Sequence, residues 1–364
     1  MFHGMRNRSI SENALVDIFM KTMGQHLSSS WRLKAGKELP DGRRRVDFLL
    51  EIRDPEGAKA TVVVEAKSQV DPRDVTRLVA DGQRLGKADY FMVLAPFLAR
   101  RTRDLLAEAG AGYADATGNL RFALEKPAVV LELTGAASNP WPEEARSLRS
   151  LKGPTAGRVI RALCDFRPPF GIRQLAQRSA TSLSSVSRVV AFLQREALVT
   201  RESETGGTRG GPITTVDWPK LIRRWTQDYS LVRSNRTQTY LDPRGLPSLL
   251  KKVKVIKSRY SVTGSLAASE VAPVAPSRLA VIYVDEMDRA ADQLSLKPAD
   301  AGANVLLAEP FDSVVFERTW TKGDVTFAAL SQVAADLLTS PGRGPAEGEE
   351  LLRWMERNEN TWRR

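Results

Sequence analysis

The sequence predicts a multidomain protein that combines α/β and α+β domains. Three observations support this prediction: a length of 364 residues, helix and strand patterns that alternate in the first third of the chain, and a proline cluster that follows them. At about 150 residues per domain, the length favours two or three domains. Hydrophobic residues form 42% and charged residues 27% of the chain, which is ordinary for folded proteins and excludes a disordered or rod-like chain.

We expect the first domain, residues 1–138, to be of α/β type because helices and strands alternate along it. Residues 9–27 place Leu15, Ile18, Phe19 and Met23 at helical spacing behind a serine that can cap the helix. Strand-like runs at 45–52 and 61–67 flank a Pro-Glu-Gly turn and predict a β-hairpin. The remaining elements expected here are helices at 72–85 and 99–109 and strands at 90–94, 119–124 and 128–133.

Two acidic residues and a lysine take matched positions on this hairpin. Asp47 lies near the start of the first strand, and Glu65 and Lys67 lie two residues apart on the second. Residues i and i+2 share one face of a strand, so these three side chains can converge across the hairpin. Carboxylate oxygens suit Mg²⁺ or Mn²⁺, and an adjacent ammonium can position or deprotonate a water for attack on phosphorus. The alternative is a solvated ladder of ion pairs.

The same residues resemble a known family. Asp47, then Glu65-Ala66-Lys67 after an apolar strand, with Glu12 on the first helix, is similar to the PD-(D/E)XK nuclease superfamily, especially its Holliday-junction-resolvase and Mrr-like branches. The resemblance covers residues 9 to about 95 and implies a restriction-endonuclease-like fold. It also implies that Asp47, Glu65 and the Ala66 carbonyl bind the metal, that Lys67 serves the attacking water, and that Glu12 completes the site.

We expect a second domain at residues 146–217, after the boundary that Pro140-Trp141-Pro142 marks. Helical patterns at 155–164, 172–178 and 182–197 precede two strand-like runs around a glycine-rich tip. This order resembles a winged helix-turn-helix of the MarR or IclR kind. A helix with small hydroxyls and an arginine on its exposed face fits the major groove, and a basic wing can follow phosphates. The expected DNA contacts are Ser184, Ser185, Ser187, Arg188, Arg201 and Arg209.

The charge distribution favours the same partner. The whole chain carries +11, but residues 146–260 contain 23 basic and 7 acidic side chains, a net charge of +16. Clustered Lys and Arg gain free energy when they release counterions from phosphates, so we expect double-stranded DNA to bind here. The alternatives are a basic surface that only keeps the protein soluble, and a winged helix that contacts only proteins.

We expect residues 218–364 to form a basic connector and a C-terminal α+β domain. Trp218 and Trp225 are seven residues apart, which predicts that both fill one face of a helix in the core. Residues 260–268, 336–338 and 341–344 resemble parts of the C-terminal domain of type IV abortive-infection antitoxins. That resemblance implies repression of a promoter and leaves open whether a partner toxin exists.

Composition restricts the cellular location and the chemistry. A single cysteine, Cys164, excludes an internal disulfide, and two histidines exclude an imidazole-rich metal site. No run approaches the roughly 18 apolar residues of a membrane span, and no secretory signal is recognisable. We therefore expect a bacterial cytoplasmic protein, associated with the nucleoid, that has no membrane partner.

Two functions remain open from the sequence. The first is a Mg²⁺-dependent DNA endonuclease or DNA-processing protein that its winged helix targets to DNA. The alternative is a transcriptional regulator or antitoxin-like repressor whose nuclease-like domain is not catalytic. By analogy with both classes, we expect a homodimer.

Overall fold

The computed structural model of the protein describes residues 10–36, 47–84, 88–141, 148, 150–202 and 211–364. These residues form two compact units: unit 1 lies before residue 148, and unit 2 comprises most of the chain from Leu148 to Arg364. Each unit combines helices with its own mixed β-sheet. The chain is therefore a mixed α/β protein of more than one domain. Within the described residues, every helix is too short or too polar to traverse a lipid bilayer.

Unit 1 is built on a seven-stranded sheet whose spatial order, β1 to β7, follows the chain. Only the β3–β4 and β4–β5 pairs are parallel. The elements of unit 1 are α1 (Glu12–His26), β1 (Arg32–Gly36), β2 (Phe48–Arg53), β3 (Lys59–Ala66), η1 (Pro72–Asp74), α2 (Val75–Gln83), β4 (Tyr90–Ala95), α3 (Arg100–Glu108), β5 (Gly112–Asp115), β6 (Leu120–Leu124) and β7 (Val129–Leu133).

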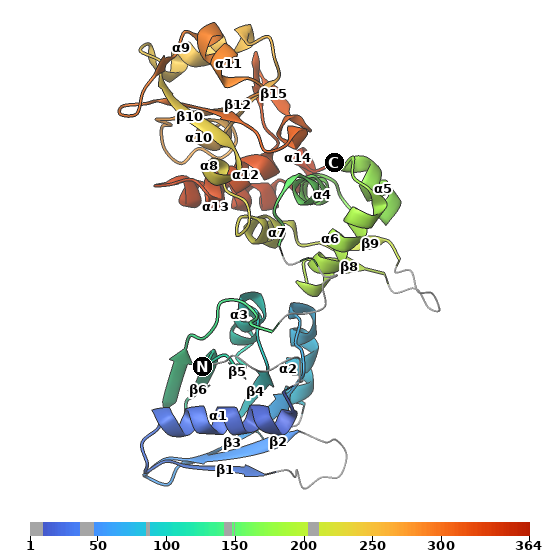
Figure 1. Cartoon of the computed structure of the whole chain (residues 1–364), viewed down its shortest axis with the longest axis vertical. Helices are drawn as coiled ribbons and strands as arrows, with labels where there is room; N and C mark the ends of the chain where they lie inside the picture. Colours follow the sequence, from blue (N-terminus) through green and yellow to red (C-terminus); the bar gives the residue numbers. More distant parts are fainter. Residues whose placement is uncertain (1–9, 37–46, 85–87, 142–147, 149, 203–210) are drawn as a thin grey trace. The chain divides into compact units, whose positions relative to one another are not determined.

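The two parallel pairs determine where the helices of unit 1 lie (Figure 1). The crossovers through α2 and α3 run in the same direction, and right-handed crossovers of that kind put both helices on one face of the sheet. Val63 and Val93 pack with α2 and α3 on that face, whereas Val62 and Val64 pack with α1 on the other. β4 and residues 62–64 of β3 are covered on both faces and are accordingly apolar.

The first helix follows the prediction except at one residue. Ser11 caps α1, because its Oγ accepts a hydrogen bond from the Ala14 N–H at 3.3 Å. Leu15, Phe19 and Met23 are buried as expected, but Ile18 is 37% exposed. The expectation for Ile18 was wrong because a helix advances about 100° per residue, which turns this position away from the buried side.

The sequence patterns missed two strands of unit 1. β1 is an edge strand whose residues are mostly exposed, so it shows no alternation of apolar and polar residues. β5 has only four residues and begins with Gly112. Both strands form because β2 and β4 offer free backbone groups beside them. The other strands and both helices expected after the hairpin are present within a few residues. Residues 45 and 46 of the expected first strand lie outside the described residues.

Unit 2 contains a three-helix segment, residues 154–216, followed by a second seven-stranded sheet in the order β13-β10-β14-β12-β11-β16-β15. The three-helix segment consists of α4 (Pro154–Asp165), α5 (Ile172–Arg178), α6 (Leu183–Arg195) and the antiparallel pair β8 (Val199–Arg201) and β9 (Ile213–Val216). The rest consists of α7 (Trp218–Trp225), α8 (Leu231–Ser234), β10 (Arg236–Leu241), α9 (Gly245–Lys252), η2 (Val253–Val255), β11 (Tyr260–Thr263), α10 (Gly264–Ser269), β12 (Ala280–Val284), α11 (Met287–Leu294), β13 (Lys297–Pro298), β14 (Val305–Glu309), η3 (Ser313–Phe316), β15 (Trp320–Lys322), β16 (Val325–Phe327), α12 (Leu330–Leu338), α13 (Gly344–Arg357) and α14 (Glu359–Trp362).

One hydrophobic core runs through both parts of unit 2. It is continuous from Leu151 in front of α4 to Met355 in α13. The boundary expected at residue 217 therefore lies inside one compact unit. Trp218 and Trp225 are 3% and 1% exposed on α7, which confirms that they fill one helix face of the core.

A buried ion network joins the three-helix segment to the C-terminal part of unit 2. Arg161 on α4 is fully buried and donates to Asp165 Oδ2 at 3.2 Å and to Gln332 Oε1 on α12 at 3.0 Å. Asp165 also accepts from the Arg318 Nε–H at 2.5 Å and from the Ser331 hydroxyl. Burial alone would raise the pKa of Asp165, but the charges of Arg161 and Arg318 outweigh burial and hold it below its ordinary value.

A second buried carboxylate extends this network and behaves in the opposite way. Asp336 on α12 accepts hydrogen bonds from Thr263, Tyr229, Tyr283 and the Gln332 amide, at 2.6 to 2.9 Å. All four donors are uncharged. Burial therefore raises the pKa of Asp336 above its ordinary value, although these hydrogen bonds oppose the rise.

We predict that Asp165→Asn destabilises the protein by about 3–5 kcal/mol, because it leaves two buried guanidinium groups without a counter-charge. Urea unfolding followed by circular dichroism measures the loss. Since the pKa of Asp165 is lowered in the folded state, its contribution is full above about pH 4 and is lost as the pH falls further. The loss of unfolding free energy in Asp165→Asn should therefore be constant between pH 5 and 8. Asp324→Asn, which breaks an exposed ion pair with Lys254, is the control and should cost about 0.2–1 kcal/mol.

Candidate functional site

Asp47, Glu65 and Lys67 come together at the end of the β2–β3 hairpin. The Lys67 ammonium lies 2.6 Å from Glu65 Oε1 and 3.5 Å from Asp47 Oδ2. Asp47 Oδ2 also accepts a hydrogen bond from the Ala66 N–H at 3.0 Å. The side chains of both acids are 22% exposed and that of Lys67 is 37% exposed, so solvent reaches the cluster. The convergence that the spacing predicted is present.

Local strand geometry produces this cluster. Phe48 pairs with Val64 in the antiparallel ladder, and extending that register by one residue places Asp47 opposite Glu65. Lys67 follows directly after β3 and is held by the hydrogen bond from its N–H to the Leu94 carbonyl of β4, at 2.9 Å. Buried Val64 and Ala66 point to the α1 side, so the alternation of the strand directs Glu65 and Lys67 to the opposite face.

The two carboxylates determine the charge state of the lysine. Burial by itself would lower the pKa of Lys67, but the hydrogen bond and the charge of Glu65, with a further contribution from Asp47, raise it above its ordinary value. Lys67 is therefore a cation at neutral pH. In this arrangement it can orient a water or stabilise negative charge on a phosphate, but it is not poised to remove a proton from water.

The donor set partly fits a divalent cation. Asp47 and Glu65 supply hard carboxylate oxygens around one point, as Mg²⁺ or Mn²⁺ prefers, and Mg²⁺ usually retains several waters beside one or two carboxylates. Among the described residues, no group of three or more acidic, histidine or cysteine side chains is arranged to hold a metal. A cation at this site would thus depend on two protein carboxylates, with the Ala66 carbonyl as the further ligand that the sequence suggested.

The structure does not bring Glu12 into contact with this cluster. Glu12 is exposed in the first turn of α1, and α1 covers the face of the sheet opposite to Glu65 and Lys67. In the described residues no hydrogen bond or ion pair joins Glu12 to the other three side chains. Its proposed role through water or metal stays a prediction.

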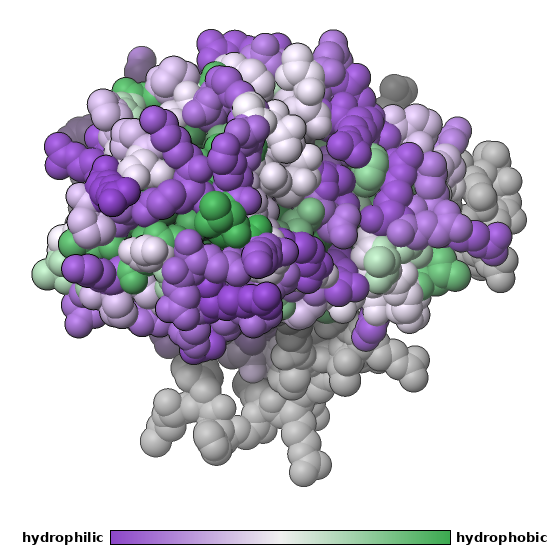
Figure 2. All heavy atoms as spheres, turned by 90° about the horizontal axis from the view of Figure 1, so that it is seen from above, coloured by the Kyte–Doolittle hydropathy of each residue, from purple (hydrophilic) through white to green (hydrophobic). Residues whose placement is uncertain are grey.

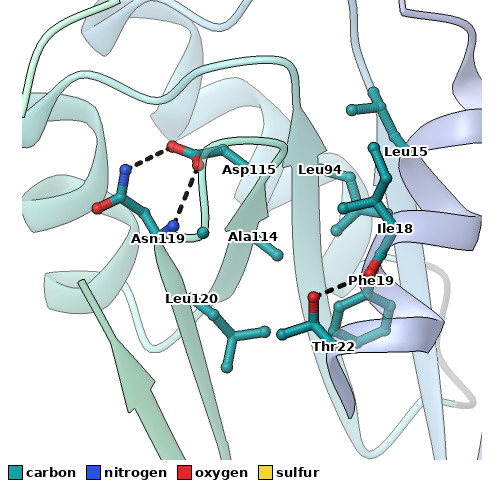
Figure 3. A pocket seen from close by; sticks show the side chains of 10 residues that line it. Leu15, Ile18, Phe19, Thr22, Leu94, Ala114, Asp115, Asn119 and Leu120 are labelled. Carbon is teal, nitrogen blue, oxygen red and sulfur yellow. Dashed lines mark hydrogen bonds between the residues drawn. The ribbon is translucent and has the colours of Figure 1, made fainter. Parts of the chain in front are cut away.

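A buried polar turn beside α1 escaped the sequence prediction. Asp115, 5% exposed at the end of β5, accepts hydrogen bonds from the backbone N–H groups of Leu98, Thr117 and Asn119, and from the Asn119 amide at 2.8 Å. Figure 3 shows Asp115 and Asn119 facing one another beside a small apolar pocket of about 10 Å³ under α1. The sequence pattern that could have predicted this turn is the run Asp-Ala-Thr-Gly-Asn at 115–119, whose residue types favour tight turns.

The surface of α6 has the arrangement expected of it. Val186, Val189, Val190 and Leu193 form the buried stripe. Ser184, Ser187 and Arg188 are exposed, while Ser185 is half-buried and accepts a hydrogen bond from Arg188 at 3.4 Å. Arg188 has no acidic partner within the described residues. Arg173, an exposed residue of α5 that the sequence analysis did not single out, also lacks an acidic partner there.

The two predicted contacts on the hairpin of the three-helix segment have different outcomes. The Arg201 Nε–H donates to the Gly211 carbonyl at 2.8 Å, so this side chain helps to close the base of the β8–β9 hairpin. Arg209 lies outside the described residues, and its role stays a prediction.

Acidic residues near the end of the chain balance part of the positive charge. Residues 261–364 contain 10 basic and 16 acidic side chains, a net charge of −6. Five ion pairs join them to basic residues of the 146–260 region: Arg158–Asp312, Arg223–Glu349, Arg236–Glu309, Lys254–Asp324 and Arg259–Asp285. Hydrophilic side chains cover most of the face drawn in Figure 2. Residues 148–364 together still contain 32 basic and 23 acidic side chains, a net charge of +9.

Comparison with known proteins found no family model, no curated protein and no solved structure that matches the chain.

We predict that the full chain binds one Mn²⁺ ion at Asp47 and Glu65. Because each carboxylate supplies part of the charge that holds the cation, Asp47→Asn and Glu65→Gln should each weaken binding about tenfold or more in isothermal titration calorimetry. Glu51→Gln is the matched control, since Glu51 lies on the same hairpin and pairs only with exposed Arg53 among the described residues. Equal Mn²⁺ affinity in all three variants would contradict a site at this cluster.

Proposed function

We propose that this protein binds duplex DNA and that unit 1 hydrolyses phosphodiester bonds with the help of a divalent metal. The observation that carries the proposal is the convergence of Asp47, Glu65 and Lys67 within ion-pair distance on a solvent-accessible edge of the sheet. Two acids and one amine around a point are the groups that metal-dependent phosphodiester hydrolysis requires.

The order of elements in unit 1 supports the resemblance to PD-(D/E)XK nucleases. A helix precedes three antiparallel strands, and a further helix leads to a fourth strand parallel to the third. The acidic pair sits on the second and third strands of this series, where the resemblance expects it. Because folds persist after their chemistry is lost, this layout supports the fold more strongly than the activity.

The residues of the cluster would have distinct roles in this reaction. A divalent metal bound by Asp47 and Glu65 would supply Lewis-acid activation of the phosphate and of water. Lys67 is charged and would donate hydrogen bonds to a non-bridging phosphate oxygen, where negative charge develops. The Ala66 N–H fixes the Asp47 carboxylate, so this acid needs little rearrangement before it binds a ligand.

The DNA-binding part of the proposal is supported by the three-helix segment. Its third helix presents serines and Arg188 to solvent, and a two-stranded hairpin follows it. A helix of this surface chemistry fits the major groove, where arginine reads guanine and serine reads either base edge. The remaining net charge of unit 2 adds a sequence-independent attraction to phosphates.

The position of Glu12 favours a second candidate, a transcriptional regulator or antitoxin-like repressor. Without a third acidic group at the cluster, Asp47, Glu65 and Lys67 would serve only as an ion-pair ladder that stabilises the hairpin. Unit 1 would then be a platform for binding or dimerisation. A regulator of this type should keep full repression when Asp47 is replaced by Ala, whereas a nuclease should not keep its activity.

We predict that the purified protein cleaves plasmid, branched or single-stranded DNA in Mg²⁺ or Mn²⁺. Lys67→Met and Asp47→Asn should lower the cleavage rate at least a hundredfold, because each removes a group that stabilises charge in the transition state. Strand breaks are scored on gels. DNA affinity should stay within about twofold, since the three-helix segment is intact.

Lys59→Met provides the matched control, because Lys59 is an exposed lysine on the same strand. Cleavage of none of the substrates, together with retained DNA binding, would exclude the nuclease and support the regulator. Cleavage that persists in both site variants would point to a contaminating enzyme.

We predict that Arg188→Ala lowers affinity for the preferred DNA site by about 1–3 kcal/mol and reduces its sequence preference, because a base contact is lost. Arg209→Ala should instead weaken binding to all sequences and reduce the salt dependence, as loss of a phosphate contact does. Fluorescence anisotropy at several salt concentrations separates the two effects. Arg353→Ala, at an exposed residue of α13, should change neither the sequence preference nor the salt dependence of DNA binding. Unchanged binding in both Arg188 and Arg209 variants would rule out this surface as the DNA interface.

A further inference from the structure

A pocket of about 300 Å³ opens within unit 2 between the end of α4, the start of β15 and the last two helices. Asp165 and Arg318 lie on one side of it, and Trp320, Trp354 and Trp362 supply its aromatic walls. None of these residues belongs to the acidic cluster of unit 1 or to the exposed face of α6. The volume is within the range of small-molecule sites, which are mostly apolar with a few fixed polar groups.

Arg318, which lines this pocket, has a hydrogen-bond donor without an acceptor. Its side chain is only 10% exposed, and its Nε–H donates to Asp165 Oδ2 at 2.5 Å. One terminal nitrogen, NH2, is buried and has no hydrogen-bond partner in the described structure. Buried polar groups in folded proteins nearly always have a partner, so this nitrogen marks a place for an acceptor.

The charge around Arg318 favours an anion as that acceptor. Asp165 is already shared with the fully buried Arg161, whose own donors go to Asp165, to Gln332 and to backbone carbonyls. One carboxylate therefore faces two guanidinium groups. Arg318 also has a positive φ of 56°, a conformation that is rare for residues other than glycine. The fold holds this arginine at the pocket despite that backbone strain.

The aromatic walls favour a ligand with a flat ring. Trp320 is fixed by stacking on Phe327, with ring centroids 4.6 Å apart, and by its hydrogen bond to the Ala328 carbonyl. Trp362 is fixed by its hydrogen bond to the Met355 carbonyl at 2.9 Å. Trp354 also lines the pocket, and its indole N–H has no partner within the described residues. Rigid aromatic surfaces of this kind stack on planar rings.

We propose that this pocket binds a small molecule that carries both an anionic group and a flat ring. The anion pairs with Arg318, and the ring packs against the tryptophans. Aromatic carboxylates and nucleoside monophosphates share this chemistry. Because Asp165 belongs to α4 and Trp354 to α13, the bound molecule touches the three-helix segment and the C-terminal part of unit 2 at once. The proposal is independent of any reaction in unit 1.

The test is isothermal titration of the full chain with 4-hydroxybenzoate and other aromatic carboxylates, with the four ribonucleoside monophosphates, and with inorganic phosphate alone. We expect at least one aromatic anion to bind with a Kd below 1 mM. Its neutral analogue, phenol or the nucleoside, should bind at least tenfold more weakly because it lacks the group that pairs with Arg318. Inorganic phosphate should also bind at least tenfold more weakly because it lacks the ring. Comparing the Kd values of the aromatic carboxylates with those of the nucleoside monophosphates shows to which of the two classes the ligand belongs.

Variants locate the site. Arg318→Gln should weaken binding of that anion at least tenfold, whereas Arg236→Gln, at an exposed residue of β10, should leave it unchanged. If Arg318→Gln does not fold, Trp354→Leu at the half-buried edge of the pocket replaces it and should weaken binding at least threefold. Failure of every aromatic anion to bind with a Kd below 1 mM would overturn the proposal. Undiminished binding by the folded pocket variants would overturn it equally.

Discussion

The packing of unit 2 depends on the buried carboxylate of Asp165. This residue ends α4 and receives hydrogen bonds from Arg161, Arg318 and Ser331, so one acid joins the three-helix segment to the loop before β15 and to α12. The cost of burying two guanidinium groups is offset because this carboxylate lies between them. Asp336 is equally buried but meets uncharged donors, and the opposite shifts in the pKa values of the two acids follow from that difference. The surface of α6 and the second sheet thus belong to one folded body.

This connection changes the interpretation of the positive charge. The sequence concentrates basic residues between 146 and 260, but the fold pairs several of them with acids from the end of the chain, for example Arg223 with Glu349. Such pairs neutralise part of the positive charge that would otherwise attract phosphates. Arg173 and Arg188 have no acidic partner within the described residues, and both are exposed, on α5 and α6 respectively. The positions of unpaired arginines therefore support DNA binding more specifically than the net charge does.

Local strand geometry brings the candidate site of unit 1 together, whereas the position of Glu12 outside it depends on how distant elements pack. Strand alternation and hairpin register suffice to bring Asp47, Glu65 and Lys67 together, so three sequence positions predicted their contact. Glu12 was expected beside them because the resemblance to PD-(D/E)XK nucleases implies that it completes the site. Its place depends on which face of the sheet α1 covers, and that follows from the two crossovers through α2 and α3. A nuclease and a regulator differ at this point, since a nuclease needs the acidic cluster for its activity and a regulator does not.

The sequence by itself determined the features that depend on neighbouring residues: a serine cap on α1, the buried stripe of α6, the hairpin with its acid pair, and the burial of Trp218 and Trp225 on one helix face. These follow from the periods of the helix and the strand, which a single segment already contains. Only the tertiary structure decided the edge strand β1, the shared core across residue 217, and the meeting of Asp165, Arg161 and Arg318. Arg318 lies more than 150 residues from its partners in the chain. The periodic pattern of a single helix or strand carries no information on contacts over such a separation in sequence. Only the packing of α4 against η3 and α12 brings these charges together.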